Sequence, residues 1–130
     1  MKIILASKSG VRKKILDKYN IETKVVVSNV DEDQVKLSLL AEGASPLDIS
    51  KNLAEIKSLK VSTKHQDQLV LGADSVISLR DELINKPSTR EEALKILKKL
   101  NNSVHYLISS VCISKNGSMI WNYTDKAVLR

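Results

Sequence analysis

Hydrophobic and polar positions along the chain follow a pattern that predicts alternating strands and helices. Residues 3–6 form a short continuous apolar run, which is typical of a buried strand. From Ser9 onward apolar residues recur at helical spacing, with Val11, Ile15 and Tyr19 on one face. A strand, a tight turn and a basic helix therefore follow one another, and such a turn presents backbone N–H groups to an anion.

The pattern continues through the middle of the chain. Residues 23–28 are rich in β-branched side chains and predict a second strand, and residues 31–33 are interpreted as an acidic loop. Ser45 is the expected N-cap of a helix that runs to about Thr63. A proline in the first turn and Asp48 as the partner in a capping box both favour this helix start.

The second half of the chain predicts one long strand, one helix and a hairpin. The strand covers residues 69–79 and the helix covers residues 89–100. The two strands of the hairpin cover residues 104–114 and 118–128. Ser88 and Glu91 form a second capping box. Asn116-Gly117, between the last two strands, strongly favours a type I′ turn. The order of elements predicts an α/β domain with a mixed β-sheet flanked by helices.

Composition and charge narrow the range of functions. The 130 residues fit a single domain, and the net charge of +6 is compatible with an anionic ligand such as a nucleotide. A lysine-rich solvated surface explains the same charge more simply. Aromatic residues make up only 3% of the chain, so the stacking platforms of a nucleic-acid binder are scarce and nucleic-acid binding is disfavoured.

Neither the single cysteine nor the N-terminus points to export. Cys112 lies in an apolar run, where it is expected to be a small buried side chain. The apolar run before Lys8 is too short for a signal peptide, and no stretch has the length of a membrane span. We expect a cytoplasmic protein.

Two short segments contain residue types that bind phosphate. Ser7, Ser9 and Arg12 lie at the first strand-to-helix turn, where hydroxyls can donate hydrogen bonds and a guanidinium can bind oxygens in a bidentate manner. Ser9 could equally be a simple N-cap. Lys86 lies in a rigid turn before a helix, where a solvated loop lysine is the simpler interpretation.

Asp74 is a carboxylate within an apolar strand, and its burial is costly without a partner. Alternation places Asp74 on the same face as Val70, Gly72 and Val76. Gly72, two residues earlier, suggests that a ligand approaches the backbone closely. An exposed edge position for Asp74 remains the alternative. Lys57, Glu32 and His105 look ordinary in isolation.

Taken together, these segments resemble the Maf family of nucleotide pyrophosphatases. The family's opening motif resembles residues 5–12, and its aspartate-glutamate pair resembles Asp31-Glu32. The family's helix segment is similar to Ala54–Ser58, and its aspartate strand is similar to Gly72–Ser75. Its lysine-proline turn is similar to Lys86-Pro87, and the helix after that turn is similar to Glu91–Ala93. The family's histidine is similar to His105.

The resemblance implies an inosine triphosphate pyrophosphatase-like fold and hydrolysis of a pyrimidine or modified nucleoside triphosphate to monophosphate and pyrophosphate. It also implies a divalent metal, Mg²⁺ or Mn²⁺, held by Glu32 and Asp74. Asp74 would orient or deprotonate the attacking water. Lys57 and Lys86 would act with it in catalysis, and the nucleotide would be bound by Ser7, Ser9, Arg12, Lys57 and Lys86.

The chain departs from the family pattern in two respects. Gly10-Val11 replaces a proline-arginine pair, which leaves Arg12 as the single arginine of this motif. The family continues beyond residue 130 with a glycine-rich segment and a late glutamine, so we expect one domain over residues 1–130 that lacks the C-terminal third. The alternatives are a non-catalytic nucleotide-binding or division-regulating homologue and a basic nucleic-acid binder. An exposed sheet edge makes a homodimer a further expectation.

Overall fold

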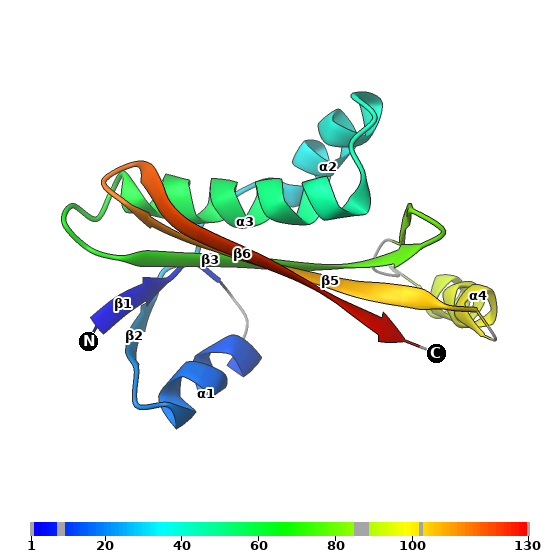
Figure 1. The fold of residues 1–130 in the computed structure, drawn as a ribbon, viewed down its shortest axis with the longest axis horizontal. Helices are drawn as coiled ribbons and strands as arrows, with labels where there is room; N and C mark the ends of the chain where they lie inside the picture. Colours follow the sequence, from blue (N-terminus) through cyan, green and yellow to red (C-terminus); the bar gives the residue numbers. More distant parts are fainter. Residues whose placement is uncertain (1, 8–9, 85–88, 102, 130) are drawn as a thin grey trace.

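The computed structural model describes residues 2–7, 10–84, 89–101 and 103–129. In chain order the elements are β1 (Lys2–Leu5), α1 (Gly10–Lys18), β2 (Glu22–Val25), α2 (Glu32–Ala41), α3 (Pro46–Ser62), β3 (Val70–Leu79), β4 (Glu82–Ile84), α4 (Arg90–Leu100), β5 (His105–Lys115) and β6 (Ser118–Leu129). Figure 1 shows α3 along one face of the sheet and α1 on the other side.

The described strands form one mixed sheet in the order β2-β1-β3-β5-β6, and β4 pairs with β3. β1 is parallel to β2 and β3, whereas β3, β5 and β6 pair in antiparallel fashion. This architecture confirms the predicted α/β class, with a mixed sheet flanked by helices. Among the described residues, no helix is both long and apolar enough to cross a membrane.

Helix α3 begins where its capping box predicts. The Ser45 hydroxyl accepts a hydrogen bond from the Asp48 backbone N–H, and the Asp48 carboxylate accepts one from the Ser45 N–H. Two orphan donors of the first turn are therefore satisfied. The helix buries Ile49 and Leu53 completely against the sheet. α3 is thus fixed along β3, which matters because both elements supply the candidate site.

Gly72 allows α3 to approach β3 closely. A Cβ atom on Gly72 would lie 2.4 Å from the Ala54 carbonyl oxygen and 2.8 Å from the Ser58 backbone nitrogen. The expectation that a ligand approaches this glycine was therefore wrong: the close neighbour is the backbone of a helix. β3 runs through Gly72 without a break, as the single long strand predicted for residues 69–79 requires.

The predicted hairpin is confirmed. Asn116 and Gly117 have φ angles of 52° and 77°, as a type I′ turn requires at its two central residues. Lys115 and Ser118 close the turn as a paired position of β5 and β6. The turn is also tied to the loop after α3, because Asn116 Nδ2 donates to Asp67 Oδ1 at 3.1 Å.

The structure corrects the acidic loop predicted at residues 31–33. Asp31 is the N-cap of α2, and its carboxylate accepts a hydrogen bond from the Gln34 backbone N–H. Asp-x-x-Gln is itself a helix-start pattern, so the signal was present in the sequence but was overlooked. The consequence is that Glu32 lies in the first turn of a helix rather than in a loop.

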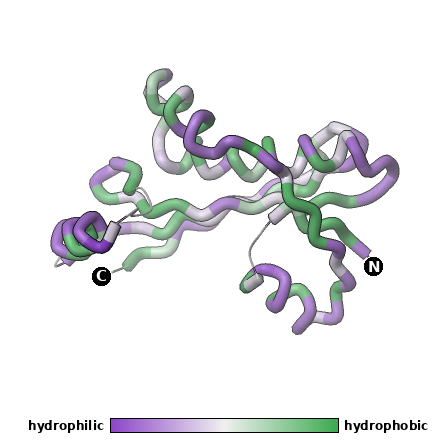
Figure 2. Tube along the Cα trace, turned by 180° about the vertical axis from the view of Figure 1, so that it is seen from behind, coloured by the Kyte–Doolittle hydropathy of each residue, from purple (hydrophilic) through white to green (hydrophobic). Residues whose placement is uncertain are grey.

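Three smaller boundaries also differ. β2 ends at Val25, three residues before the predicted end of that strand, and a short β4 follows β3. Helix α4 is capped by Thr89, whose hydroxyl accepts from the Glu92 N–H, one position later than the predicted capping box. Ser88 lies outside the described residues. Figure 2 shows that the outer helix α4 is mostly hydrophilic, whereas hydrophobic segments occur along the strands.

Candidate active site

The open edge of β3 defines the candidate site. β5 pairs with β3 along one edge from Val70 to Ser78. On the other edge β1 pairs with Val70 and Leu71, and β4 pairs with residues 77–79. Within the described chain, residues 72–76 therefore have no strand partner on this edge. The Lys57 side chain reaches the backbone of β3 there, at the Ala73 carbonyl oxygen.

Asp74 lies in the middle of this open stretch. It is 7% exposed, and its side chain points to the face covered by α3, as the predicted alternation required. The Oδ1 atom accepts from Lys57 Nζ at 3.1 Å. The Oδ2 atom is buried and has no hydrogen-bond partner among the described residues. A buried carboxylate oxygen without a donor is costly, so the arrangement favours a ligand or cation at this atom.

Lys57 connects three oxygen atoms. Besides Asp74, its ammonium contacts the Ala73 carbonyl oxygen at 3.2 Å and forms an ion pair with Glu32. α3 supplies Lys57, α2 supplies Glu32 and β3 supplies the other two. The Lys57 ammonium thus donates to the Ala73 carbonyl oxygen on the open edge of β3. In a paired strand, a backbone N–H of the neighbouring strand would donate to such a carbonyl. The structure brings together three of the residues expected from the sequence, Asp74, Lys57 and Glu32.

The ionisation of Asp74 reflects this environment. Burial raises the pKa of the Asp74 carboxyl above its ordinary value, while the adjacent Lys57 ammonium opposes the shift. Burial is the larger effect. Raising the pKa of a carboxyl brings it closer to neutral pH, which is the range in which a general base is most effective.

Ser7 and Arg12 form a second group. Arg12 Nη1 donates to Ser7 Oγ at 3.0 Å across the turn between β1 and α1. The Ala6 backbone N–H donates to the Leu71 carbonyl, so continuing the parallel register places Ser7 level with Ala73. The hydroxyl and the guanidinium therefore lie beside the same open stretch of β3 as Asp74.

Two of the expected site residues, Ser9 and Lys86, lie outside the described residues, so the structure does not place them. His105 begins β5, and its Nδ1 atom lies 3.2 Å from the Ser103 carbonyl oxygen.

Sequence reasoning missed the hydrogen bonds that two serines of α3 form with the backbone of β3. Ser50 Oγ donates to the Asp74 carbonyl at 3.1 Å, and Ser58 Oγ donates to the Val70 carbonyl at 2.9 Å; both serines are fully buried. Ser50, Ala54 and Ser58 are small residues at intervals of four, on the helix face that meets Gly72. This spacing was the signal that could have identified them.

Asp74 and Glu32 are the candidate metal ligands at this site. The described residues contain no group of three or more His, Cys, Asp or Glu side chains arranged to hold a metal. Asp74 and Glu32 nevertheless share one cationic partner, and Asp74 Oδ2 lacks a donor. Mg²⁺ in nucleotide sites is commonly held by one or two carboxylates together with water and substrate phosphates, so this pair matches such a site.

Sequence comparison identifies the family. The family described as Maf-like protein matches residues 2–129. The chain belongs to the Maf-like family. A relative named nucleoside triphosphate pyrophosphatase, from Pelagibacter ubique, is 65% identical over 127 residues, which are 98% of this chain and 65% of the relative. A 7-methyl-GTP pyrophosphatase from Brucella abortus is 35% identical over 127 residues, covering 98% of this chain and 64% of that protein.

Solved structures share the fold of this Maf-like chain. A nucleoside-triphosphatase and dITP/XTP pyrophosphatase from Mycobacterium abscessus has a TM-score of 0.60 at 15% identity, with 98% of this chain and 72% of that chain covered. The Ham1 protein of Staphylococcus aureus has a TM-score of 0.50 at 14% identity, with 99% and 70% covered. The expected inosine triphosphate pyrophosphatase-like fold is confirmed.

Proposed function

We propose that this Maf-like chain is a nucleoside triphosphate pyrophosphatase that releases nucleoside monophosphate and pyrophosphate. The observation that supports the proposal most strongly is Asp74, a buried carboxylate bound to Lys57 at an open strand edge beside Ser7 and Arg12. The names of the curated relatives point to the same reaction. Because the chain spans 65% of the Pelagibacter relative, the activity of the whole protein is part of the proposal.

In the proposed reaction a water oxygen attacks the α-phosphorus while the bond to the oxygen that bridges to the β-phosphorus breaks. The ionised Asp74 carboxylate takes the proton of this water, and pyrophosphate leaves. Lys57 lies against Asp74 and neutralises negative charge that develops on the phosphates. Arg12 and Ser7 bind the phosphate chain, and we assign Ser9 and Lys86 to the same role.

A divalent ion, Mg²⁺ or Mn²⁺, held by Asp74 and Glu32 would add electrostatic stabilisation of the phosphate oxygens. Lys57 would then neutralise the excess negative charge of the two carboxylates. The sequence-based expectation of a pyrimidine or modified nucleotide remains a proposal, and 7-methyl-GTP joins the candidates because of the Brucella relative.

Release of pyrophosphate from a panel of triphosphates with Mg²⁺ or Mn²⁺ tests the function. The panel contains UTP, dTTP, GTP and 7-methyl-GTP. We expect Asp74→Asn to lower the rate about 100-fold or more, because a general base contributes on that order, while nucleotide binding persists. Asp81→Asn is the matched control, since Asp81 is exposed just beyond the end of β3. A wild-type rate in Asp74→Asn contradicts the role of Asp74.

A non-catalytic nucleotide-binding protein is the second candidate. The replacement of a proline-arginine pair by Gly10-Val11 favours it, because Arg12 is then the single arginine of this phosphate-binding motif. This candidate predicts that nucleotides raise the melting temperature through binding to the folded state, with no pyrophosphate formed by any member of the panel.

A further inference from the structure

One face of helix α2 is turned toward the candidate site. Four residues of this helix are half-buried, and the others are exposed. The half-buried residues are Glu32, Val35, Lys36 and Leu39. Spacings of three and four residues place them on a single face, and α2 packs against α3. Because Glu32 contacts Lys57 of α3 on this face, Lys36 lies on the side of α2 that faces the Asp74 cluster.

The charge of Lys36 acts on Asp74. Burial has the largest effect on the pKa of the Asp74 carboxyl and raises it, whereas the charges of Lys57 and, to a smaller extent, Lys36 lower it. An opposite charge has such an effect only when it lies near the titrating group. The position of Lys36 on the inner face of α2 accounts for this proximity.

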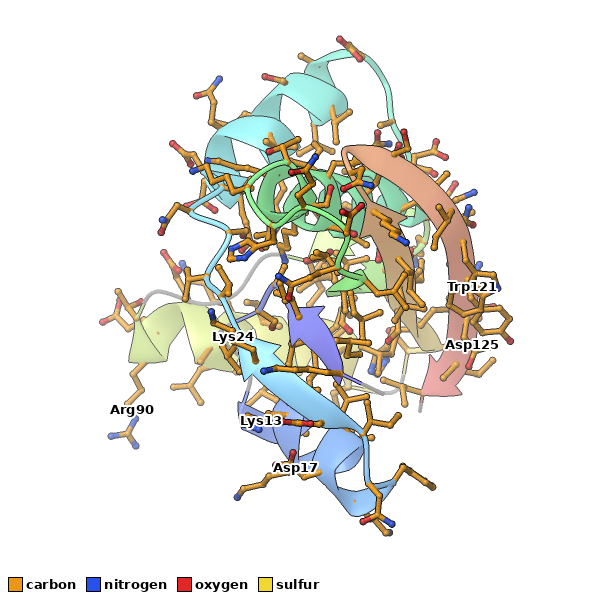
Figure 3. The ribbon with its side chains drawn as sticks, turned by 90° about the vertical axis from the view of Figure 1, so that its left-hand side faces the viewer. Lys13, Asp17, Lys24, Arg90, Trp121 and Asp125 are labelled. Atoms are coloured by element: carbon orange, nitrogen blue, oxygen red, sulfur yellow. The ribbon has the colours of Figure 1, made fainter. Side chains whose placement is uncertain are left out.

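Lys36 has no hydrogen bond or ion pair to another described residue. Glu32 lies one helical turn before it, a spacing and order at which an acid and a lysine commonly pair. Helix α1 contains a pair at this spacing, since Lys13 Nζ lies 3.2 Å from Asp17 Oδ1, and Figure 3 shows both residues on that helix. In α2 the Glu32 carboxylate pairs with Lys57 instead. The Lys36 ammonium is therefore available to another anion.

Lys57 already uses its hydrogen-bond donors within the protein. An ammonium group has three N–H donors. Lys57 faces three acceptors, which are the Asp74 and Glu32 carboxylates and the Ala73 carbonyl oxygen. A phosphate oxygen would have to displace one of them to bind Lys57, so Lys57 acts on a phosphate through its charge. Lys36 can donate to a phosphate oxygen directly without losing a contact to the described chain.

We propose that Lys36 binds the phosphate chain of the nucleoside triphosphate at the Asp74 centre. This inference rests on the proposed pyrophosphatase function and adds a substrate-binding residue to the same site. Arg12 reaches the open stretch of β3 from the turn between β1 and α1, whereas Lys36 comes from α2. Cations from two separate parts of the chain would therefore bind the phosphates. Hydrogen bonds between charged partners are stronger than neutral ones, so the loss of this contact is measurable.

Binding of two phosphate compounds tests the role of Lys36. One is inorganic tripolyphosphate, and the other is an analogue of GTP with a methylene group between the α- and β-phosphorus atoms, which cannot be cleaved there. Lys36→Met keeps an apolar stem and removes the charge. We expect the affinity for both compounds to fall about tenfold or more, because both contain the phosphate chain. Lys36→Arg should retain much of the affinity, since a guanidinium also binds phosphate oxygens.

Lys51→Met is the matched control. Lys51 is an exposed lysine of α3 that lines a cavity with Met119 and Asn122 of β6. Its replacement makes the same change in net charge and should leave both affinities unchanged. Equal losses in Lys36→Met and Lys51→Met reveal a general effect of net charge and overturn the proposal. Wild-type affinity for tripolyphosphate in Lys36→Met also overturns it, whatever happens to the GTP analogue.

Thermal unfolding separates binding from a purely structural role. If Lys36 only balanced the charge of Asp74, Lys36→Met would lower the melting temperature and leave both affinities unchanged, which contradicts the proposal. The binding measurements need no turnover. The predicted affinity pattern without pyrophosphate release from any triphosphate rejects the enzymatic function and retains Lys36 as a phosphate-binding residue. Turnover with a wild-type KM in Lys36→Met rejects the role of Lys36 and retains the function.

Discussion

Lys57 forms ion pairs with two carboxylates, those of Asp74 and Glu32. Its ammonium contacts Asp74 and Glu32, so this cluster of three charged side chains has a net negative charge when both acids are ionised. Buried charges of this kind need compensation, and Asp74 Oδ2 is without it in the described part of the chain. This uncompensated negative charge destabilises the folded protein, and it would favour binding of a cation at the proposed reaction centre.

Replacing Lys57 tests this balance. Lys57→Met removes the cation and leaves Asp74 buried beside another acid, so we expect the free energy of unfolding to fall by about 3 kcal/mol. Urea denaturation measures the change. Adding Asp74→Asn to Lys57→Met should recover much of the loss, since the uncompensated charge is then gone. Independent, additive effects of the two substitutions would contradict direct coupling.

Asp74 also predicts how stability changes with pH. Its pKa is raised in the folded protein, so the unfolded chain loses this proton at lower pH than the folded one. The protonated carboxyl stabilises the folded protein fully at pH values below its ordinary pKa of 3.8. This stabilisation is lost as the pH rises through the raised pKa of the folded state. Asp74→Asn should lack this decline, as measured by urea denaturation at several pH values, whereas Asp81→Asn should keep it. Parallel curves for wild type and Asp74→Asn would contradict the raised pKa.

At the scale of elements, contact between α3 and β3 positions the site. The small residues Ser50, Ala54 and Ser58 face β3, and the two serines bond to its carbonyls. Gly72 provides the matching space on the strand. This close contact brings the helix backbone against the strand and places Lys57 at the open edge.

Gly72→Ala tests the close contact. The added methyl group would meet the backbone of α3, which cannot move as a flexible side chain can. We expect a loss of about 2–3 kcal/mol of stability from overpacking, together with weaker nucleotide binding. Gly10→Ala is the control, because nothing lies within 4 Å of its added Cβ, and it should be neutral or slightly stabilising. Equal melting temperatures for the two variants would contradict the steric argument.

At the scale of the whole molecule, the described chain buries its core mainly between α3 and the sheet. α1 and α4 contain no buried residues, and two apolar side chains of α1, Val11 and Ile15, are more than half exposed. Within the described residues, β6 lies at one edge of the sheet, and nearly all of its residues are exposed. Exposed edges and apolar surface are typical of association sites, so a homodimer stays a prediction.

Cys112 is a chemical probe of the packing of this core. It lies between the sheet and α3, is 1% exposed, and its burial raises the pKa of the thiol. Because the thiolate is the reactive form, we expect slow labelling by a thiol reagent at pH 8 in native buffer and rapid labelling in urea. The labelling rate should follow global unfolding across a denaturant series. Rapid labelling of the folded protein would contradict the closed packing of α3 on β5.

Local patterns in the sequence determined several features by themselves. The capping box at Ser45 and Asp48, the Asn116-Gly117 turn and the burial of Cys112 follow from neighbouring residues and from composition, and the structure confirms them. Such features depend on interactions within a few residues, which the sequence displays directly. The face of β3 on which Asp74 lies follows equally from strand alternation.

Only the tertiary structure decided which distant residues meet. Lys57 looked like an ordinary helix lysine and Glu32 like part of a loop, yet packing of α3 and α2 beside β3 brings both to one ammonium–carboxylate cluster. The reason for Gly72 was likewise a helix 14 to 18 positions away in sequence, at Ala54 and Ser58. Pairings across the sheet, such as Ser75 with Ser109, depend on register between strands that are remote along the chain, and no local pattern specifies that register.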